Sequence, residues 1–245
     1  MSRYRIDVAY DGTDYAGWQI QPNGMTVQQR IEEALKALTG EAAKLHGSGR
    51  TDQGVHAQRQ VAHFDLEKPA APRTLLRGLN AILPPDIRVL RARKAAPDFH
   101  ARRSAAGKEY RYFIWNAELM SPFVRRYAAR VRTPLDVPAM RRAAAALVGR
   151  HDFAAFTANP NRVVESTVRR LTALTVSKRG RTVTITARAD GFLYRMVRSL
   201  AGFLIRVGEG AAPPEEAARI LASRVRTARV PTAPPQGLFL WNVYY

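Results

Sequence analysis

The chain has 245 residues, of which 46% are apolar, and this is enough for one large domain or two smaller halves around a hydrophobic core. Its 39 Lys and Arg residues against 20 Asp and Glu residues give a formal net charge of +19, which favours a polyanion such as nucleic acid as partner. The absence of cysteine excludes disulfides, thiolate nucleophiles and cysteine-bound metals.

Most of the basic residues are arginines, since only six of the 39 are lysines. Guanidinium groups bind phosphates bidentately and stack on bases, so this bias suits RNA. A GC-rich coding sequence or adaptation to heat would also explain arginine over lysine, but not the excess of bases over acids. The N-terminus lacks an apolar signal-peptide core, and no stretch approaches the ~18 apolar residues of a membrane span. We therefore expect a cytoplasmic, soluble protein without membrane association.

The first predicted elements are a strand and a helix separated by a glycine-containing polar loop. Alternating apolar residues from Tyr4 to Tyr10 predict a half-buried strand. Thr26, with Gln29 three residues later, forms a capping-box pattern at the start of a helix that ends at Gly40. The connecting loop covers residues 11–24.

The next segment, HGSGRTDQGVHAQ at residues 46–58, has little periodicity and leads into a strand over residues 60–65. Polar, glycine-containing loops that lead into strands often present catalytic groups. A helix is predicted over residues 74–82, ended by two prolines, and a strand over residues 87–92.

A basic loop after Pro97 marks the predicted boundary between two halves, residues 1–105 and 106–245. The second half begins with an aromatic strand containing Tyr110. It continues with a helix over 137–147, strands on either side of residues 178–180, a helix over 192–207, a short helix over 215–223 and a final strand over 238–244. This order predicts an α+β fold in which two similar halves share a mostly antiparallel central sheet flanked by helices, with a basic cleft between them.

Asp52 is the candidate catalytic carboxylate. It lies between Gly49 and Gly54, with Arg50 two residues away. An aspartate ordinarily titrates at about pH 3.9, so its carboxylate is available as a nucleophile or base. An aspartate that caps a turn would give the same local pattern. Arg50 can pair with Asp52, contact phosphate, occupy the space of a displaced base, or be one of many solvated arginines.

Two further candidates lie in the second half. Tyr110 can stack on a base or exchange a proton, although strand tyrosines are commonly packed residues with a wet hydroxyl. At about 100° per residue, Arg198 falls opposite the apolar stripe of its helix, which places it either on a solvated face or in a cleft. The five histidines form no metal-ligand motif, and no phosphate-binding loop or dinucleotide fingerprint is present. We therefore expect neither a metal nor a nucleotide cofactor.

The stretch GRTDQGVHAQRQVAHF, residues 49–64, resembles the signature of the TruA family of tRNA pseudouridine synthases. Four other segments resemble the family in the same order: YDGTDYAGWQIQ, KEYRYFIWN, GFLYRMVRSLAGFLIRVGEG and APPQGLFLWNVYY. Together they span nearly the whole chain. No signature aligns with FTANPNRVVESTVRR, residues 156–170.

The resemblance implies the pseudouridine synthase fold and isomerisation of uridine at positions 38, 39 and 40 in the anticodon stem-loop of tRNA, without a cofactor or metal. It makes Asp52 the essential aspartate, Arg50 the residue that holds or replaces the flipped base, and Tyr110 the active-site tyrosine. Arg198 matches a basic residue that pairs with the aspartate. It also implies a homodimer in which one tRNA touches both subunits.

Two other functions fit the composition. A non-catalytic RNA-binding protein would share the charge and the α+β pattern, but gives no reason for the residue 49–64 motif. A nucleosidase or RNA glycosylase would also begin by attack at the ribose C1′, and would be distinguished by release of free uracil.

Overall fold

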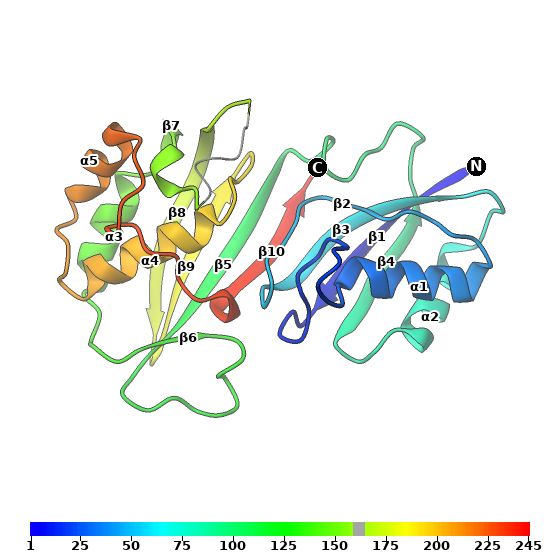
Figure 1. The fold of residues 1–245 in the computed structure, drawn as a ribbon, viewed down its shortest axis with the longest axis horizontal. Coiled ribbons are helices and arrows are strands. Elements are labelled where there is room, and N and C mark those ends of the chain that lie inside the picture. The colour runs from blue at the N-terminus through cyan, green and yellow to red at the C-terminus, as the bar shows by residue number, and fades with distance from the viewer. Residues whose placement is uncertain (159–164) are drawn as a thin grey trace. The chain divides into compact units, whose positions relative to one another are not determined.

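The computed structural model describes residues 1–158 and 165–245, which form two compact units (Figure 1). Unit 1 consists of Met1–Ala106 together with Phe239–Tyr245, and unit 2 of Gly107–Leu238. Residues 159–164, within the stretch to which no motif was assigned, lie outside the described residues. The α+β class, the mostly antiparallel sheet and the arrangement in two halves are confirmed. That halves 1–105 and 106–245 each contribute to the active site stays a prediction.

Unit 1 is a sheet with strand order β4, β1, β3, β10, and β2 pairs with β3. The strand β1 is antiparallel to β3 and β4, whereas β10 runs parallel to β3. The helices α1 and α2 pack against each other, with Gly78 against the side chain of Leu38 (Figure 1). The elements are β1 (Ser2–Tyr10), α1 (Val27–Thr39), β2 (His46–Gly47), β3 (His56–Leu66), α2 (Pro72–Ile82), β4 (Ile87–Lys94) and β10 (Leu238–Tyr244).

The helix boundaries follow from local chemistry. The Thr26 hydroxyl accepts a hydrogen bond from the Gln29 amide at the start of α1, which confirms the predicted cap. At its end, Gly40 adopts φ 76° and donates its N–H to the Lys36 carbonyl. The helix α2 starts two residues before the predicted Thr74, because Pro72 fits the first helical turn without needing its missing N–H.

The strand β1 is buried on both faces, so the prediction of a half-buried strand was wrong. Asp7 is buried and binds Arg5 and Arg59 with N to O distances of 3.3 Å and 2.8 Å. The Arg5 guanidinium also lies 4.1 Å from the ring centre of Tyr245. Ion pairs and an aromatic ring therefore cover the face of β1 that carries Arg5 and Asp7, which the alternating sequence pattern predicted to be exposed to solvent.

Three histidines pack together on this second face. The ring of His63, on β3, lies 5.0 Å from that of His46 and 4.7 Å from that of His100. Its Nδ1 accepts the Ala101 N–H at 3.2 Å. Burial, reinforced by the neighbouring His100 and His46, lowers the pKa of His63 to about 4. His63 is therefore neutral at pH 7.

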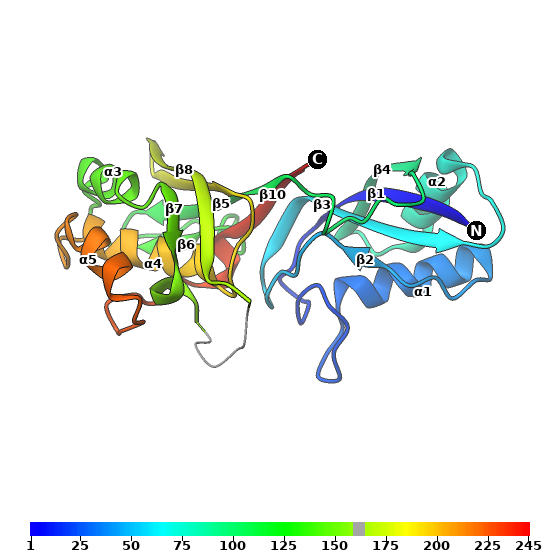
Figure 2. The same ribbon diagram turned by 90° about the horizontal axis from the view of Figure 1, so that it is seen from above.

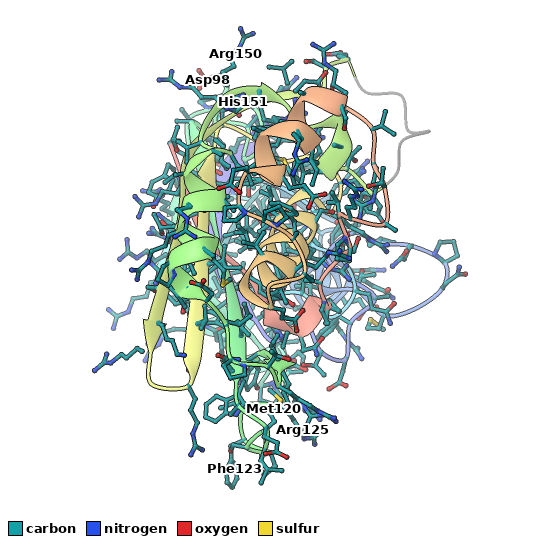
Figure 3. The ribbon with its side chains drawn as sticks, turned by 90° about the vertical axis from the view of Figure 1, so that its left-hand side faces the viewer. Asp98, Met120, Phe123, Arg125, Arg150 and His151 are labelled. Carbon is teal, nitrogen blue, oxygen red and sulfur yellow. The ribbon has the colours of Figure 1, made fainter. Side chains whose placement is uncertain are left out.

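Unit 2 is an antiparallel sheet with strand order β5, β9, β8, β7, and β6 runs parallel to β5 (Figure 2). The helices α3 and α4 pack against each other, α3 on β8 and α4 on β5, and Figure 3 views this unit from the helix side. The elements are β5 (Gly107–Asn116), β6 (Ala129–Val131), α3 (Val137–Ala145), β7 (Gly149–Asp152), η1 (Ala154–Phe156), β8 (Val168–Arg179), β9 (Thr182–Ala189), α4 (Met196–Gly208), α5 (Glu216–Ser223) and η2 (Pro235–Gly237).

Most predicted elements of unit 2 are confirmed, with two differences. The helix was predicted to start at Phe192 but starts at Met196. Arg195 adopts a left-handed backbone with φ 55°, so the helix does not extend towards Phe192. The short strands β6 and β7 were not predicted from the sequence. Among the described residues, no helix is long and apolar enough to cross a membrane.

The histidine cluster predicts that stability falls on mild acidification. A histidine in the unfolded chain titrates near pH ~6.5, so between that value and about pH 4 the unfolded state binds a proton that folded His63 does not. The free energy of unfolding should therefore drop by up to about 3 kcal/mol over this window. Urea titrations at pH 7.5, 5.5 and 4.5 measure it.

His63→Gln should flatten this pH dependence, whereas His151→Gln, outside the cluster, should leave it as in the wild type. An equally steep decline in His63→Gln and the wild type would show that another group is responsible.

Candidate active site

Asp52 and Arg50 lie on the loop of residues 48–55, which joins β2 to β3 in unit 1. The Asp52 side chain is partly exposed and Arg50 is exposed, whereas Ser48, Thr51 and Val55 in the same loop are buried. Buried residues that anchor the loop therefore alternate with residues whose side chains reach the solvent.

The strand β3 holds the beginning of this loop through the buried side chain of Gln60. The Ser48 hydroxyl donates to Gln60 Oε1 at 2.6 Å, and Gln60 Nε2 donates to the Gly49 carbonyl at 2.9 Å. The Ser48 N–H also donates to the Val61 carbonyl at 2.7 Å. These three bonds fix the backbone directly before Arg50.

The centre of the loop is held by two residues from the first twenty of the chain, Tyr10 and Trp18. The Tyr10 and Thr51 hydroxyls lie 2.8 Å apart in a buried hydrogen bond, and the Trp18 N–H donates to the Thr51 carbonyl at 3.1 Å. A turn, in which the Val55 N–H donates to the Asp52 carbonyl at 3.1 Å, closes around Asp52. The residues on both sides of Asp52 are thus fixed.

Two glycines of the loop over residues 11–24 let the backbones of the two loops meet. A Cβ atom on Gly12 would overlap the Val55 carbonyl, and one on Gly17 would lie 2.6 Å from the Thr51 carbonyl oxygen. Gly17 also has φ 103°, which side-chain-bearing residues rarely adopt. The segment that looked like a polar connection in the sequence supports the candidate carboxylate.

Tyr110 lies on β5 in unit 2 and is buried. Its ring meets the ring of Phe192 edge-on, with the centres 5.0 Å apart. The arrangement fits a ring that is held in place by packing.

Arg198 lies on α4 and is 9% exposed, so the solvated-face alternative was wrong. Its Nε donates to the Ala233 carbonyl at 2.8 Å, and the Ala233 N–H donates to the Arg198 carbonyl at 3.0 Å. The segment around Ala233 reaches this side of α4 because Gly202 has no side chain: a Cβ there would overlap the Pro231 carbonyl. This tertiary contact could not be seen in the helical pattern.

Two further arginines lie near the start of α4. Arg195 holds a left-handed backbone just before the helix, a costly conformation of the kind found at functional sites. Arg226 donates to the Ser199 hydroxyl at 2.8 Å, and burial, with the charge of Arg195, lowers its pKa. With Arg198, they concentrate positive charge where the helix dipole also favours anions. Neither Arg195 nor Arg226 was singled out in the sequence.

The structure thus describes two pairs of candidates, Arg50 with Asp52 in unit 1 and Tyr110 with Arg198 in unit 2. The pairing of Arg198 with Asp52 stays a prediction. Within residues 1–158 and 165–245, no group of three or more His, Asp or Glu side chains is placed to hold a metal ion. The chemistry available here is that of a carboxylate, a phenol and guanidinium groups.

Comparison with known proteins identifies sequences similar to this chain. The family described as tRNA pseudouridine synthase matches residues 7–102 and 143–245. A tRNA pseudouridine synthase A from Geotalea uraniireducens is 46% identical over 245 residues, covering 100% of both chains. Proteins of the same name from Syntrophotalea carbinolica and Myxococcus xanthus are 47% and 44% identical, with all of this chain aligned to 97% and 92% of theirs.

Because the two loops approach each other closely, we expect Gly17→Ala to lower the free energy of unfolding more than the same substitution at a glycine without close neighbours. Gly40→Ala is the matched control, because Gly40 also has a positive φ but nothing lies within 4 Å of an added Cβ. We expect Gly40→Ala to lose about 1 kcal/mol of unfolding free energy through strain, and Gly17→Ala about 2–4 kcal/mol through strain plus overlap.

Urea unfolding measures both variants, and amide hydrogen exchange at Trp18 reports whether the loop contact has opened. Equal losses of unfolding free energy in the two variants would show that the Asp52 loop moves to make room for the added methyl group without loss of stability.

Proposed function

Because the chain belongs to the tRNA pseudouridine synthase family, we propose that Asp52 is the carboxylate with which it isomerises uridine to pseudouridine in tRNA. The observation that carries this proposal is the loop of residues 48–55. Its buried residues are anchored on both sides of Asp52, while the carboxylate itself stays partly exposed. Such a rigid presentation is what positioning for catalysis requires.

The reaction breaks the bond between ribose C1′ and uracil N1, turns the base and joins C1′ to C5. C5 loses a proton and N1 gains one. Atoms and electrons balance within the substrate, so the reaction needs no external oxidant or reductant. The target base must first leave its stack, at a cost of a few kcal/mol. The Asp52 carboxylate then attacks C1′ to form a sugar ester, or removes a ribose proton to form a glycal. Both routes free the uracil.

Arg50, Tyr110 and Arg198 are proposed as substrate-binding residues. The exposed Arg50, two residues from Asp52, can hold the flipped base or fill its place. Tyr110, fixed by Phe192, offers a phenol to the base or to the proton at C5. Arg198 and the charge near the start of α4 favour the anionic backbone of the RNA.

The anticodon stem-loop is proposed as the region that is modified, at positions 38, 39 and 40, and a homodimer in the cytoplasm as the functional form. The family resemblance supports these three points. A net charge of +19 suits an enzyme that docks on folded RNA through its shape and its phosphates.

Asp52→Asn should abolish turnover and retain tRNA binding, because it removes the nucleophile or base but little of the binding surface. The measurement is tritium release from tRNA carrying [5-³H]uridine, alongside a binding assay. Asp98→Asn is the matched control, since it removes the same charge from an exposed loop of unit 1 and should leave turnover unchanged.

Turnover by Asp52→Asn near the wild-type rate would rule out the proposed role. Release of free uracil by the wild type would instead indicate a glycosylase.

Tyr110→Phe separates the two roles of the tyrosine, because it keeps the ring against Phe192 and removes only the hydroxyl. If the phenol assists proton transfer, kcat should fall about 10²- to 10⁴-fold with little change in KM. Tyr110→Leu, which also removes the ring, should raise KM in addition. An unchanged kcat in Tyr110→Phe would limit the residue to packing and stacking.

A further inference from the structure

The connection between β5 and β6, residues 117–128 of unit 2, exposes apolar side chains to solvent. Phe123 is 88% and Leu119 79% exposed, more than any other large apolar side chain of the described residues except Met1. Figure 3 shows Met120, Phe123 and Arg125 together at the lower end of the view, with Phe123 outermost. Solvation of a large aromatic ring is unfavourable, so a ring held out in this way indicates a binding surface.

Hydrogen bonds within the loop hold this conformation. The Trp115 indole N–H donates to the Leu119 carbonyl at 2.8 Å, and the Ser121 hydroxyl accepts the Phe123 N–H at 3.3 Å. The Tyr127 N–H donates to the Val124 carbonyl at 2.9 Å. Because the loop is already folded, a ligand that covers Phe123 does not have to bear the full entropic cost of ordering it.

The loop carries positive charge beside the apolar tip. Residues 117–128 contain two arginines, Arg125 and Arg126, and one acid, Glu118, and two more arginines follow at positions 130 and 132. Arg125 is exposed beside the tip. An aromatic ring next to a guanidinium is the combination that binds nucleic acids, because bases stack on the ring and phosphates bind the cation.

The charge decides between two kinds of partner. A symmetric contact centred on this loop would bring Arg125 and Arg126 close to the same arginines of the second copy, so the homodimer proposed above is expected to use another surface. A polyanion neutralises those charges as it covers the apolar tip. RNA therefore fits this surface better than a second copy does.

We propose that the loop of residues 117–128 is an RNA contact in addition to the Asp52 loop, in which Phe123 stacks on an unpaired base of the tRNA and Arg125 binds a phosphate. This proposal rests on the proposed function in that it takes tRNA as the ligand. The contact serves binding and takes no part in bond making. It should therefore affect affinity and KM, and leave kcat unchanged at saturating tRNA.

The test compares Phe123→Ala, Phe123→Trp and the control Val225→Ala, which shortens another exposed apolar side chain of unit 2, 61% exposed. Loss of one stacked base predicts about 5- to 150-fold weaker tRNA binding and a matching rise in KM for Phe123→Ala. Phe123→Trp should restore both, and Val225→Ala should match the wild type. Arg125→Gln should reduce the salt dependence of tRNA binding by about one unit of log–log slope.

Unchanged affinity in Phe123→Ala would overturn the proposal. So would light-scattering masses showing that Phe123→Ala dissociates a wild-type dimer, because the surface would then serve a second copy. The binding assay does not depend on turnover. A wild type that binds tRNA but releases no tritium would therefore count against the role of Asp52, while the affinities of the Phe123 variants would still test the proposed contact.

Discussion

The candidate active site depends on one steric constraint, the contact between the backbones of residues 11–18 and 48–55. Gly12 and Gly17 lie so close to the second loop that a methyl group at either position would meet its carbonyl oxygens. The hydrogen bonds of Thr51 with Tyr10 and Trp18 then fix the two loops to each other. The loop that carries Asp52 is thus held by two glycines, by backbone groups and by the side chains of Tyr10 and Gln60.

Elements that are determined locally could be predicted from the sequence. The cap at Thr26, the stop at Gly40 and the turn at Gly180 each act within a few residues, so their signals are visible in a short window. Features set by distant parts of the chain could not be predicted. The second face of β1 is buried by ion pairs and the Tyr245 ring, and Arg198 is covered by the segment around Ala233.

The site shows the same division. Asp52, Arg50, Tyr110 and Arg198 could be named because the segments around them resemble a family signature. The residues that support Asp52 could not be named, because a tyrosine in a strand and a glutamine such as Gln60 look the same whether they hold a loop or face solvent. Their role follows from a hydroxyl 2.8 Å from Thr51 and an amide 2.9 Å from the Gly49 carbonyl. Both distances depend on how strands far apart in the sequence align.

The strand β10 has a consequence for how this enzyme is made. Its pairing places Phe239 beside His56 at the start of β3, with the rings 4.5 Å apart, and His56 in turn accepts the Gly12 N–H at 3.0 Å. A ribosome translates all of unit 2 before it reaches Phe239. The contact of Phe239 with His56 therefore forms only after unit 2 has been synthesised, so the support of the Asp52 loop is completed late in synthesis.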